Sequence, residues 1–91
     1  MTAQSNFGDD RALDELCALV MHLATQLVDN PDQVEVTAER DGNAVQVRLN
    51  VPEEDMGKVI GREGRIARSM RTLLTIAASR RGLRSSLDIG A

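Results

Sequence analysis

The order in which the hydrophobic periods change along the chain is the feature that most limits its possible folds. Apolar residues first recur with helical spacing, then alternate with polar residues through two runs, return to helical spacing, and alternate once more. We therefore expect helices over about 10–29, 53–60 and 64–81, and strands over about 33–40, 43–51 and 83–89. The resulting order, αββααβ, indicates an α+β protein.

Capping and turn-forming residues separate these elements. Asp9 and Asp10 stand where the first helix should begin, since acids there accept hydrogen bonds from free N–H groups and complement the helix dipole. Asn30-Pro31 ends that helix. The segment Asp41-Gly42-Asn43 tolerates positive φ and predicts a hairpin between the first two strands. The last helix is expected to bury the face that carries its apolar residues, at positions 66, 70, 73, 74 and 77.

Few side chains in this composition suit catalysis, metal binding or base stacking. Phe7 is the only aromatic residue, so the core must be aliphatic, and the base-stacking faces of RRM and OB domains are excluded. Cys17 is the only cysteine and is expected in the core, whereas His22, the only histidine, is expected on the surface. Because no apolar run is typical of a signal peptide or a membrane helix, we predict a cytoplasmic protein without a membrane segment.

Charge is distributed unevenly along the chain. Residues 1–57 carry three arginines against twelve acidic residues, a net charge of −9. Residues 58–91 carry Lys58 and seven arginines against Glu63 and Asp88, a net charge of +6. The overall charge of −3 therefore conceals a basic region. That region is either a solvated helix face or a binding face whose acidic surroundings suppress non-specific association.

The segment Gly61-Arg62-Glu63-Gly64 joins the two predicted helices of the basic region. Two glycines three residues apart let the chain turn tightly and let another backbone come close. Free N–H groups in the turn and at the start of the next helix form a site for anions, and Arg62 and Arg65 add positive charge beside it. The segment is neither a Walker loop nor a dinucleotide fingerprint, because the residues and the βαβ context of those motifs are absent.

At these residues the sequence resembles the KH domain, whose hallmark is a Gly-x-x-Gly loop flanked by aliphatic residues. The order αββααβ resembles the type II variant, and the similarity spans about residues 10–89, with residues 1–9 left as a flexible arm before a single domain, 10–91. It is closer still to the small bacterial proteins of the KhpA family, through Asn30-Pro31-Asp32 and the run Pro52–Gly61. The resemblance implies a three-stranded sheet packed against three helices, with single-stranded RNA bound at the Gly-x-x-Gly cleft.

The family's binding residues carry over by position. Gly61, Arg62, Glu63 and Gly64 would clamp the sugar–phosphate backbone, with Lys58 and Arg65 as charged neighbours. Val59, Ile60 and Ile66 would lie partly in the core and partly under the bases, and the closeness of Arg68 to the loop adds it to the set. Glu63 is expected to weaken the attraction for phosphate. The resemblance also implies self-association, pairing with a larger KhpB/Jag-type KH protein, and links to RNA regulation and cell shape.

Two further hypotheses stand beside RNA binding. The first is a KH-fold interaction module that forms dimers and binds RNA weakly, which would be favoured if Ile60, Ile66 or Met70 formed an exposed patch. The second is a small enzyme, which we do not expect, because no nucleophile–base pair or paired acid–base constellation is present. Glu53-Glu54-Asp55 could suggest a metal site, but the expected role of these acids is to begin a helix. No cofactor and no small-molecule substrate are predicted.

Overall fold

The computed structural model describes residues 10–91, and the predicted flexible arm, together with Asp9 and Phe7, lies outside these residues. The first helix, α2, spans Arg11–Leu27 and begins at Asp10, whose carboxylate accepts a hydrogen bond from the Leu13 N–H at 3.3 Å. Helix α2 has one buried face, formed by Leu16, Val20 and Ala24. The helical spacing of the sequence and the predicted start at Asp10 are confirmed.

The strands form one mixed sheet. Strand β1 (Glu35–Asp41) pairs antiparallel with β2 (Ala44–Asn50), and β2 pairs in parallel with β3 (Arg84–Gly90). The strand order is β1-β2-β3. Gly42 has a φ of 62° in the turn between β1 and β2, which confirms the hairpin. A short 3₁₀ turn at Pro31–Gln33 leads from α2 into the sheet.

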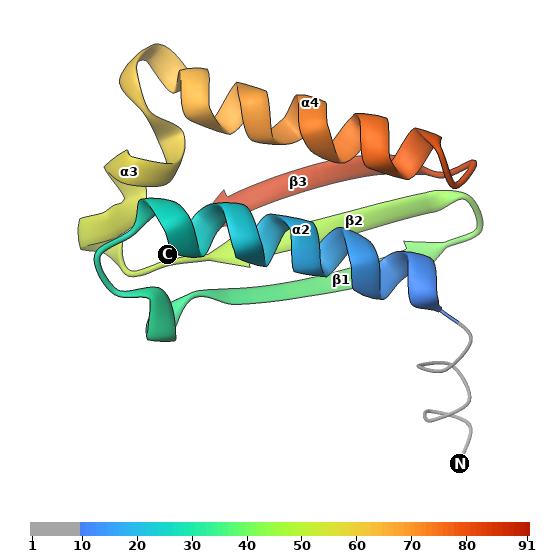
Figure 1. The fold of residues 1–91 in the computed structure, drawn as a ribbon, viewed down its shortest axis with the longest axis horizontal. Coiled ribbons are helices and arrows are strands. Elements are labelled where there is room, and N and C mark those ends of the chain that lie inside the picture. Colours follow the sequence, from blue (N-terminus) through green and yellow to red (C-terminus); the bar gives the residue numbers. More distant parts are fainter. Residues whose placement is uncertain (1–9) are drawn as a thin grey trace.

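Two further helices connect β2 to β3. A 3₁₀ turn at Glu53–Asp55 continues into α3, Met56–Ile60, and a second 3₁₀ turn at Arg62–Gly64 leads into α4, Arg65–Ser79. Figure 1 shows α2 and α4 running in opposite directions across one face of the sheet, with α3 at one end. The predicted α+β class and the order αββααβ are confirmed.

The core between helices and sheet is aliphatic, as the near absence of aromatic residues requires. The inward-facing positions of β2 are the best buried, since Val45, Val47 and Leu49 are at most 2% exposed. Cys17 is only partly buried, and burial together with the nearby Asp14 carboxylate raises its pKa, so the thiol stays protonated at neutral pH. His22 is exposed as expected.

The predicted buried face of α4 is confirmed except at one residue, since Met70 and Leu74 are buried and Ile66 and Ala77 pack half-buried against the core. Helix α4 buries Ala67, Met70, Leu74 and Ala78, whereas Leu73 is exposed. At 100° per residue, Leu73 lies about 100° around the helix from the centre of the buried residues. Hydrophobicity alone selects leucine over alanine for the core, so the sequence pattern placed Leu73 inside and left out Ala67 and Ala78.

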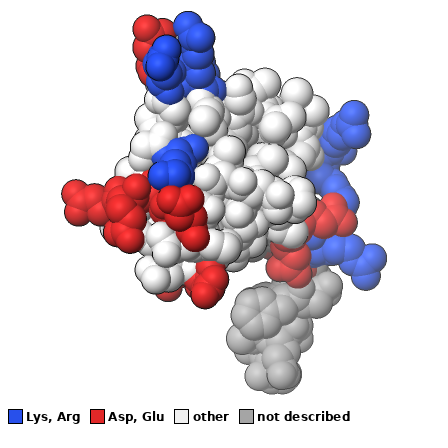
Figure 2. Space-filling view, turned by 60° about the vertical axis from the view of Figure 1, so that its left-hand side comes forward, with Lys and Arg blue, Asp and Glu red and all other residues white. Residues whose placement is uncertain are grey.

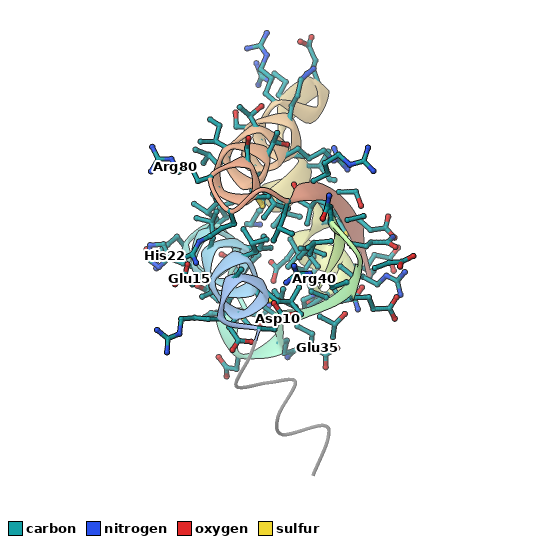
Figure 3. The ribbon with its side chains drawn as sticks, turned by 90° about the vertical axis from the view of Figure 1, so that its right-hand side faces the viewer. Asp10, Glu15, His22, Glu35, Arg40 and Arg80 are labelled. Atoms are coloured by element: carbon teal, nitrogen blue, oxygen red, sulfur yellow. The ribbon has the colours of Figure 1, made fainter. Side chains whose placement is uncertain are left out.

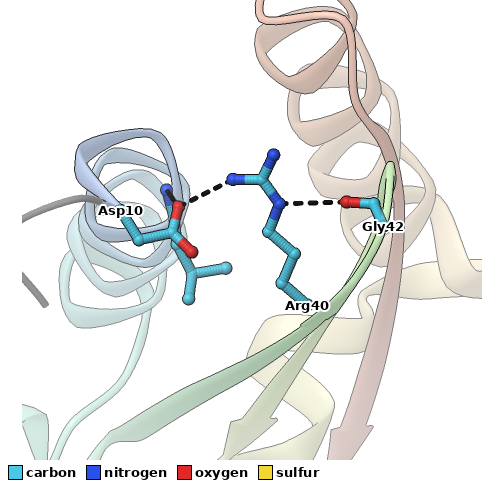
Figure 4. A network of polar contacts seen from close by, with 4 residues as sticks. Asp10, Arg40 and Gly42 are labelled. Atoms are coloured by element: carbon cyan, nitrogen blue, oxygen red, sulfur yellow. Dashed lines mark hydrogen bonds and ion pairs between the residues drawn. The ribbon is translucent and has the colours of Figure 1, made fainter. Parts of the chain in front are cut away.

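Arg40 links the start of α2 to the hairpin. Its Nη1 donates to the Asp10 carboxylate at 3.0 Å, and its Nε donates to the Gly42 carbonyl at 3.0 Å (Figure 4). Asp10 thus caps α2 and at the same time binds a cation from β1. This contact holds the first helix against the end of the sheet that lies opposite α3 (Figure 1).

Candidate nucleic-acid interface

The connection between α3 and α4 is a sharp turn built from left-handed backbone. Gly61, Glu63 and Gly64 have φ values of 78°, 58° and 74°. A Cβ on Gly61 would lie 2.6 Å from Cγ1 of Ile66, so only glycine fits there. A Cβ on Gly64 would meet no atom within 4 Å, so this position opens to solvent. The two glycines therefore differ: Gly61 lets the turn pack, and Gly64 leaves space above it.

The first turn of α4 presents donors to that open space. Gly64 occupies the N-cap position and no side chain caps the helix there. The first N–H groups of a helix lack partners within the helix, and the positive end of its dipole lies among them. Together with the open space at Gly64, this helix start is suited to a phosphate.

The arginines of the loop surround Glu63. Arg65 pairs with the Glu63 carboxylate at 3.2 Å, and Nη2 of Arg68 donates to the Glu63 carbonyl at 2.8 Å. With Arg62, which is exposed, these side chains place three positive charges and one negative charge around a single turn. Figure 2 shows basic side chains with an acidic one at the top of the molecule, where Figure 1 places the α3–α4 connection. The structure thus brings together Arg62, Glu63, Arg65 and Arg68.

The remaining predicted site residues lie in different surroundings. Nζ of Lys58 lies 3.3 Å from the Asp29 carboxylate, so this cation is paired with the end of α2. Val59 is fully buried, which makes it core beneath the loop and not a contact surface. Ile60 and Ile66 are half-buried, and Ile66 packs against Gly61. Val59 is thus the core member of this set, and Ile60 and Ile66 are the members accessible enough to lie under bases.

A buried carboxylate fixes the position of α3. Asp55 is fully buried, and its two oxygens accept hydrogen bonds from the Asp29 N–H, the Asn30 N–H and the Asn30 amide at 3.3, 3.2 and 3.0 Å. Burial raises the pKa of Asp55, but these hydrogen bonds and nearby Lys58 lower it more, so the pKa lies below its ordinary value. Asp55 therefore ties the start of α3 to the end of α2.

A separate groove lies between the middle of α4 and the first half of β3. It encloses about 280 Å³, and Nε of Arg71 donates across it to the Leu87 carbonyl at 3.3 Å. It is lined by Arg71, Leu74, Thr75, Ser85, Ser86 and Leu87. The sequence placed Arg71 and Thr75 on the basic side of a helix, but nothing in their spacing showed that β3 lies opposite them.

A metal site and a membrane-spanning helix are both absent from residues 10–91. Within residues 10–91, no three His, Cys, Asp or Glu side chains are grouped so that they could hold a metal ion. Glu53 and Glu54 are exposed at the turn before α3, while Asp55 points into the protein. None of the helices in this range is long and apolar enough to cross a bilayer.

Comparison with known proteins identifies related chains. The family model for the KhpA/KhpB KH domain matches residues 18–89. The chain is 45% identical over 71 residues to the RNA-binding protein KhpA of Halalkalibacterium halodurans, an alignment that covers 78% of this chain and 93% of that protein. It is 46% identical over 71 residues to the RNA-binding protein KhpA of Caldanaerobacter subterraneus, with 78% and 95% covered.

The similarity extends to a third protein. The RNA-binding protein KhpA of Bacillus subtilis is 39% identical over 71 residues, covering 78% of this chain and 83% of the relative. No solved structure matches the chain. The matched region contains most of α2, then β1, β2, α3, α4 and all of β3 except Gly90, and thus the whole Gly61–Gly64 turn. The chain therefore belongs to the KhpA/KhpB family of KH-domain proteins.

Proposed function

We propose that this protein binds single-stranded RNA at the turn between α3 and α4 and carries out no catalysis. The observation that carries the proposal is the open space above Gly64, at an uncapped helix start surrounded by three arginines. The names of the relatives, RNA-binding protein KhpA, support the same function. We further propose that it acts in the cytoplasm as a post-transcriptional regulator or RNA chaperone, together with a KhpB/Jag-type KH partner.

The turn suits a phosphodiester strand for two reasons. A phosphate above Gly64 can accept hydrogen bonds from N–H groups in the first turn of α4 that follow Arg65, because no side chain occupies that space. The Arg65 N–H itself already donates to the Arg62 carbonyl. Arg62 and Arg68 flank the same position, and Arg65 shares its charge with Glu63. The negative charge of the strand would thus be met by the dipole at the start of α4 and by the arginine side chains beside it.

The bases of such a strand can contact two surfaces. Ile60 and Ile66 offer a half-buried aliphatic surface beside the turn. The groove between α4 and β3 adds the hydroxyl groups of Ser85 and Ser86 and the guanidinium of Arg71. Aliphatic contact and hydrogen bonding replace aromatic stacking in this arrangement, consistent with a chain that has a single aromatic residue.

A salt series with a labelled pool of random single-stranded RNA tests the proposal. The three arginines and Glu63 amount to about two net positive charges, so the slope of log affinity against log salt should be about −1.4. Arg62→Asp combined with Glu63→Asp should abolish binding. Arg11→Asp changes the net charge equally but lies at the start of α2, at the opposite end of the molecule, and should bind like the native chain (Figure 1).

Two results would contradict the proposal. If the loop variant binds as tightly as the native chain, the turn is not the site. If the native chain shows no affinity for RNA at low salt, the function itself is wrong.

Glu63→Gln should strengthen RNA binding, whereas the preceding loop variant should abolish it. The change removes an acid beside the phosphate position and frees Arg65 from a pair in which both side chains are largely exposed. Exposed pairs of this kind are worth up to about 1 kcal/mol, so RNA affinity should rise about two- to fivefold. An unchanged or weaker affinity would show that the Glu63–Arg65 pair holds the turn in its binding shape instead of competing with phosphate.

Self-association is the second function to consider. The exposed patch of Ile60, Ile66 or Met70 that would favour it is not present, because Met70 is buried and Ile60 and Ile66 are half-buried. The exposed large apolar side chains of residues 10–91 are instead Leu73 and Ile76. Light scattering on a size-exclusion column, with refractive-index detection because Trp and Tyr are absent, measures whether the chain forms dimers.

A further inference from the structure

Strand β3 is an edge strand, and half of its backbone groups point away from β2. The Arg84 N–H donates to the Asn43 carbonyl, so the backbone of residue 84 faces β2. Successive residues of a strand direct their N–H and C=O groups alternately to its two sides. Leu87, three residues further on, therefore directs its backbone groups to the free edge. Figure 3 shows β3 at the edge of the sheet beside α4, with Glu35 of β1 at the opposite edge.

Arg71 reaches this free edge from α4 and occupies one of its acceptors. Its Nε donates to the Leu87 carbonyl at 3.3 Å. A guanidinium carries only donors, and those on Nη1 and Nη2 remain, since Arg71 forms no ion pair with any residue from 10 to 91. The Leu87 N–H lies on the same side of the strand and is not used by the sheet. Around Arg71 the groove thus offers donors, while the acceptor of Leu87 is already bound.

The groove has room for one nucleobase. It encloses about 280 Å³, slightly less than the roughly 300–1,000 Å³ of pockets that hold whole drug-sized ligands. Leu74 and Leu87 contribute apolar lining that can contact the flat face of a base. Arg71 follows Gly64 by seven residues, so it lies about 10 Å along α4 from the phosphate position. A strand held at the α3–α4 turn can therefore place one of its next bases in the groove.

The donors of the groove distinguish the two purines. Guanine presents two acceptors side by side, O6 and N7, and an arginine pairs with both through parallel N–H groups. Adenine carries an amino group in place of O6, and that amine would face a guanidinium that has no acceptor. Adenine could reach the Leu87 carbonyl only by displacing Arg71 from it. The same side chain therefore attracts guanine and opposes adenine.

We propose that Arg71 makes the groove between α4 and β3 selective for guanine over adenine. Its free donors pair with O6 and N7 of the base, and its Nε keeps the Leu87 carbonyl covered. This inference rests on the proposed function, since it concerns one base of the single-stranded RNA bound at the α3–α4 turn. A bidentate contact of this kind discriminates about 5- to 150-fold against the wrong base. The turn thus binds the phosphate backbone, and the groove selects one base.

Three short labelled RNA oligomers of equal length test the inference on the native chain. All consist of uridine except for one central purine, which is guanine, adenine or 7-deazaguanine, a guanine that lacks the N7 acceptor. Fluorescence anisotropy at low salt should show that the guanine oligomer binds at least about fivefold more tightly than the adenine oligomer. The 7-deazaguanine oligomer should lose most of this advantage, because only one of the two parallel hydrogen bonds can form.

Two variants that remove the same charge assign the preference to Arg71. Arg71→Met removes the paired donors and uncovers the Leu87 carbonyl, so the ratio of guanine to adenine affinity should fall to about one or below. Arg84→Met removes a charge from β3, but residue 84 alternates with residues 85 and 87 and lies on the other face of the sheet. Its ratio should equal that of the native chain. Both arginines are exposed, so the fold should persist, and circular dichroism checks this.

Three results would overturn the inference alone. They are equal binding of the guanine and adenine oligomers by the native chain, a native ratio retained in Arg71→Met, or a 7-deazaguanine oligomer that binds as tightly as guanine. The proposed function would still stand if Arg62→Asp combined with Glu63→Asp abolished binding of the same oligomers. No binding of any oligomer at low salt would overturn the inference and the proposed function together.

Discussion

Substituting the two glycines of the α3–α4 turn separately should produce unequal losses of stability. Gly61 has φ 78° and ψ 173°, a combination that is almost confined to glycine, whereas Gly64 has φ 74° and ψ 15°, a left-handed conformation that other residues adopt at a cost. A Cβ at position 61 would also overlap Ile66, while a Cβ at position 64 would meet nothing within 4 Å. Gly61→Ala adds both strain and overlap, and Gly64→Ala adds strain alone.

The expected losses of stability follow from the backbone strain and the steric overlap. The backbone strain of Gly61→Ala should cost about 1–3 kcal/mol, and the overlap at 2.6 Å a further ~1–3 kcal/mol. Gly64→Ala should cost about 1–2 kcal/mol. A domain of this size has a total stability of roughly 5–15 kcal/mol, so Gly61→Ala removes a large part of it and Gly64→Ala does not.

Urea unfolding followed by far-UV circular dichroism measures both losses, since the chain has no tryptophan or tyrosine to report by fluorescence. Ile66→Ala removes the two outermost atoms that the new Cβ would meet. Gly61→Ala should therefore cost at least about 1 kcal/mol less in the Ile66→Ala background than in the native chain. The cost of Gly64→Ala should be the same in both backgrounds. Equal costs for the two glycines, or no coupling between positions 61 and 66, would refute the steric argument.

Two further perturbations test contacts that hold the fold around the site. Asp55→Asn should lower the melting temperature at pH 7, and the deficit should shrink as the pH falls below about 4. The reason is that the lowered pKa of Asp55 gives a stabilisation that is present above the ordinary pKa of an aspartate and is lost as the carboxylate becomes protonated. A deficit that does not depend on pH would contradict this. Arg40→Ala should cost about 0.5–1 kcal/mol in low salt by urea unfolding, through its 3.0 Å pair with Asp10, and less in high salt. Arg48→Ala, whose pair is longer at 3.6 Å and more exposed, should cost less, and the reverse order would show that the cap of α2 does not need Arg40.

The elements could be predicted from the sequence because their periods follow local geometry. Alternation in β2 places Val45, Val47 and Leu49 on one side, and that side must face the helices. The turn at Gly61–Gly64 was also readable, since positive φ at two nearby positions strongly selects glycine. These features depend on a few consecutive residues, which is why spacing alone reveals them.

Features that depend on packing between distant segments could not be predicted. Asp55 looked like an exposed helix-start acid beside Glu53 and Glu54, and only the fold brings Asn30 to it from 25 residues away. Arg71 and the Leu87 carbonyl form one groove because β3 pairs with β2 in parallel. The exposure of Leu73 depends on which face of α4 packs against the core. In each case the partner is set by tertiary structure and has no fixed offset in sequence.

The parallel pairing of β2 with β3 has a consequence for how the protein folds. Hairpin partners in β1 and β2 lie at most fifteen residues apart, from Asp41 with Ala44 to Glu35 with Asn50. Every β2–β3 partner lies forty residues away, from Ala44 with Arg84 to Asn50 with Gly90. Closing so long a segment costs more entropy before any contact repays it. We expect the hairpin to form first and β3 to join last. The segment enclosed by this last step contains the Gly61–Gly64 turn, so an early intermediate built on the hairpin would lack a finished loop. A binding-competent loop would then appear only with the completed sheet.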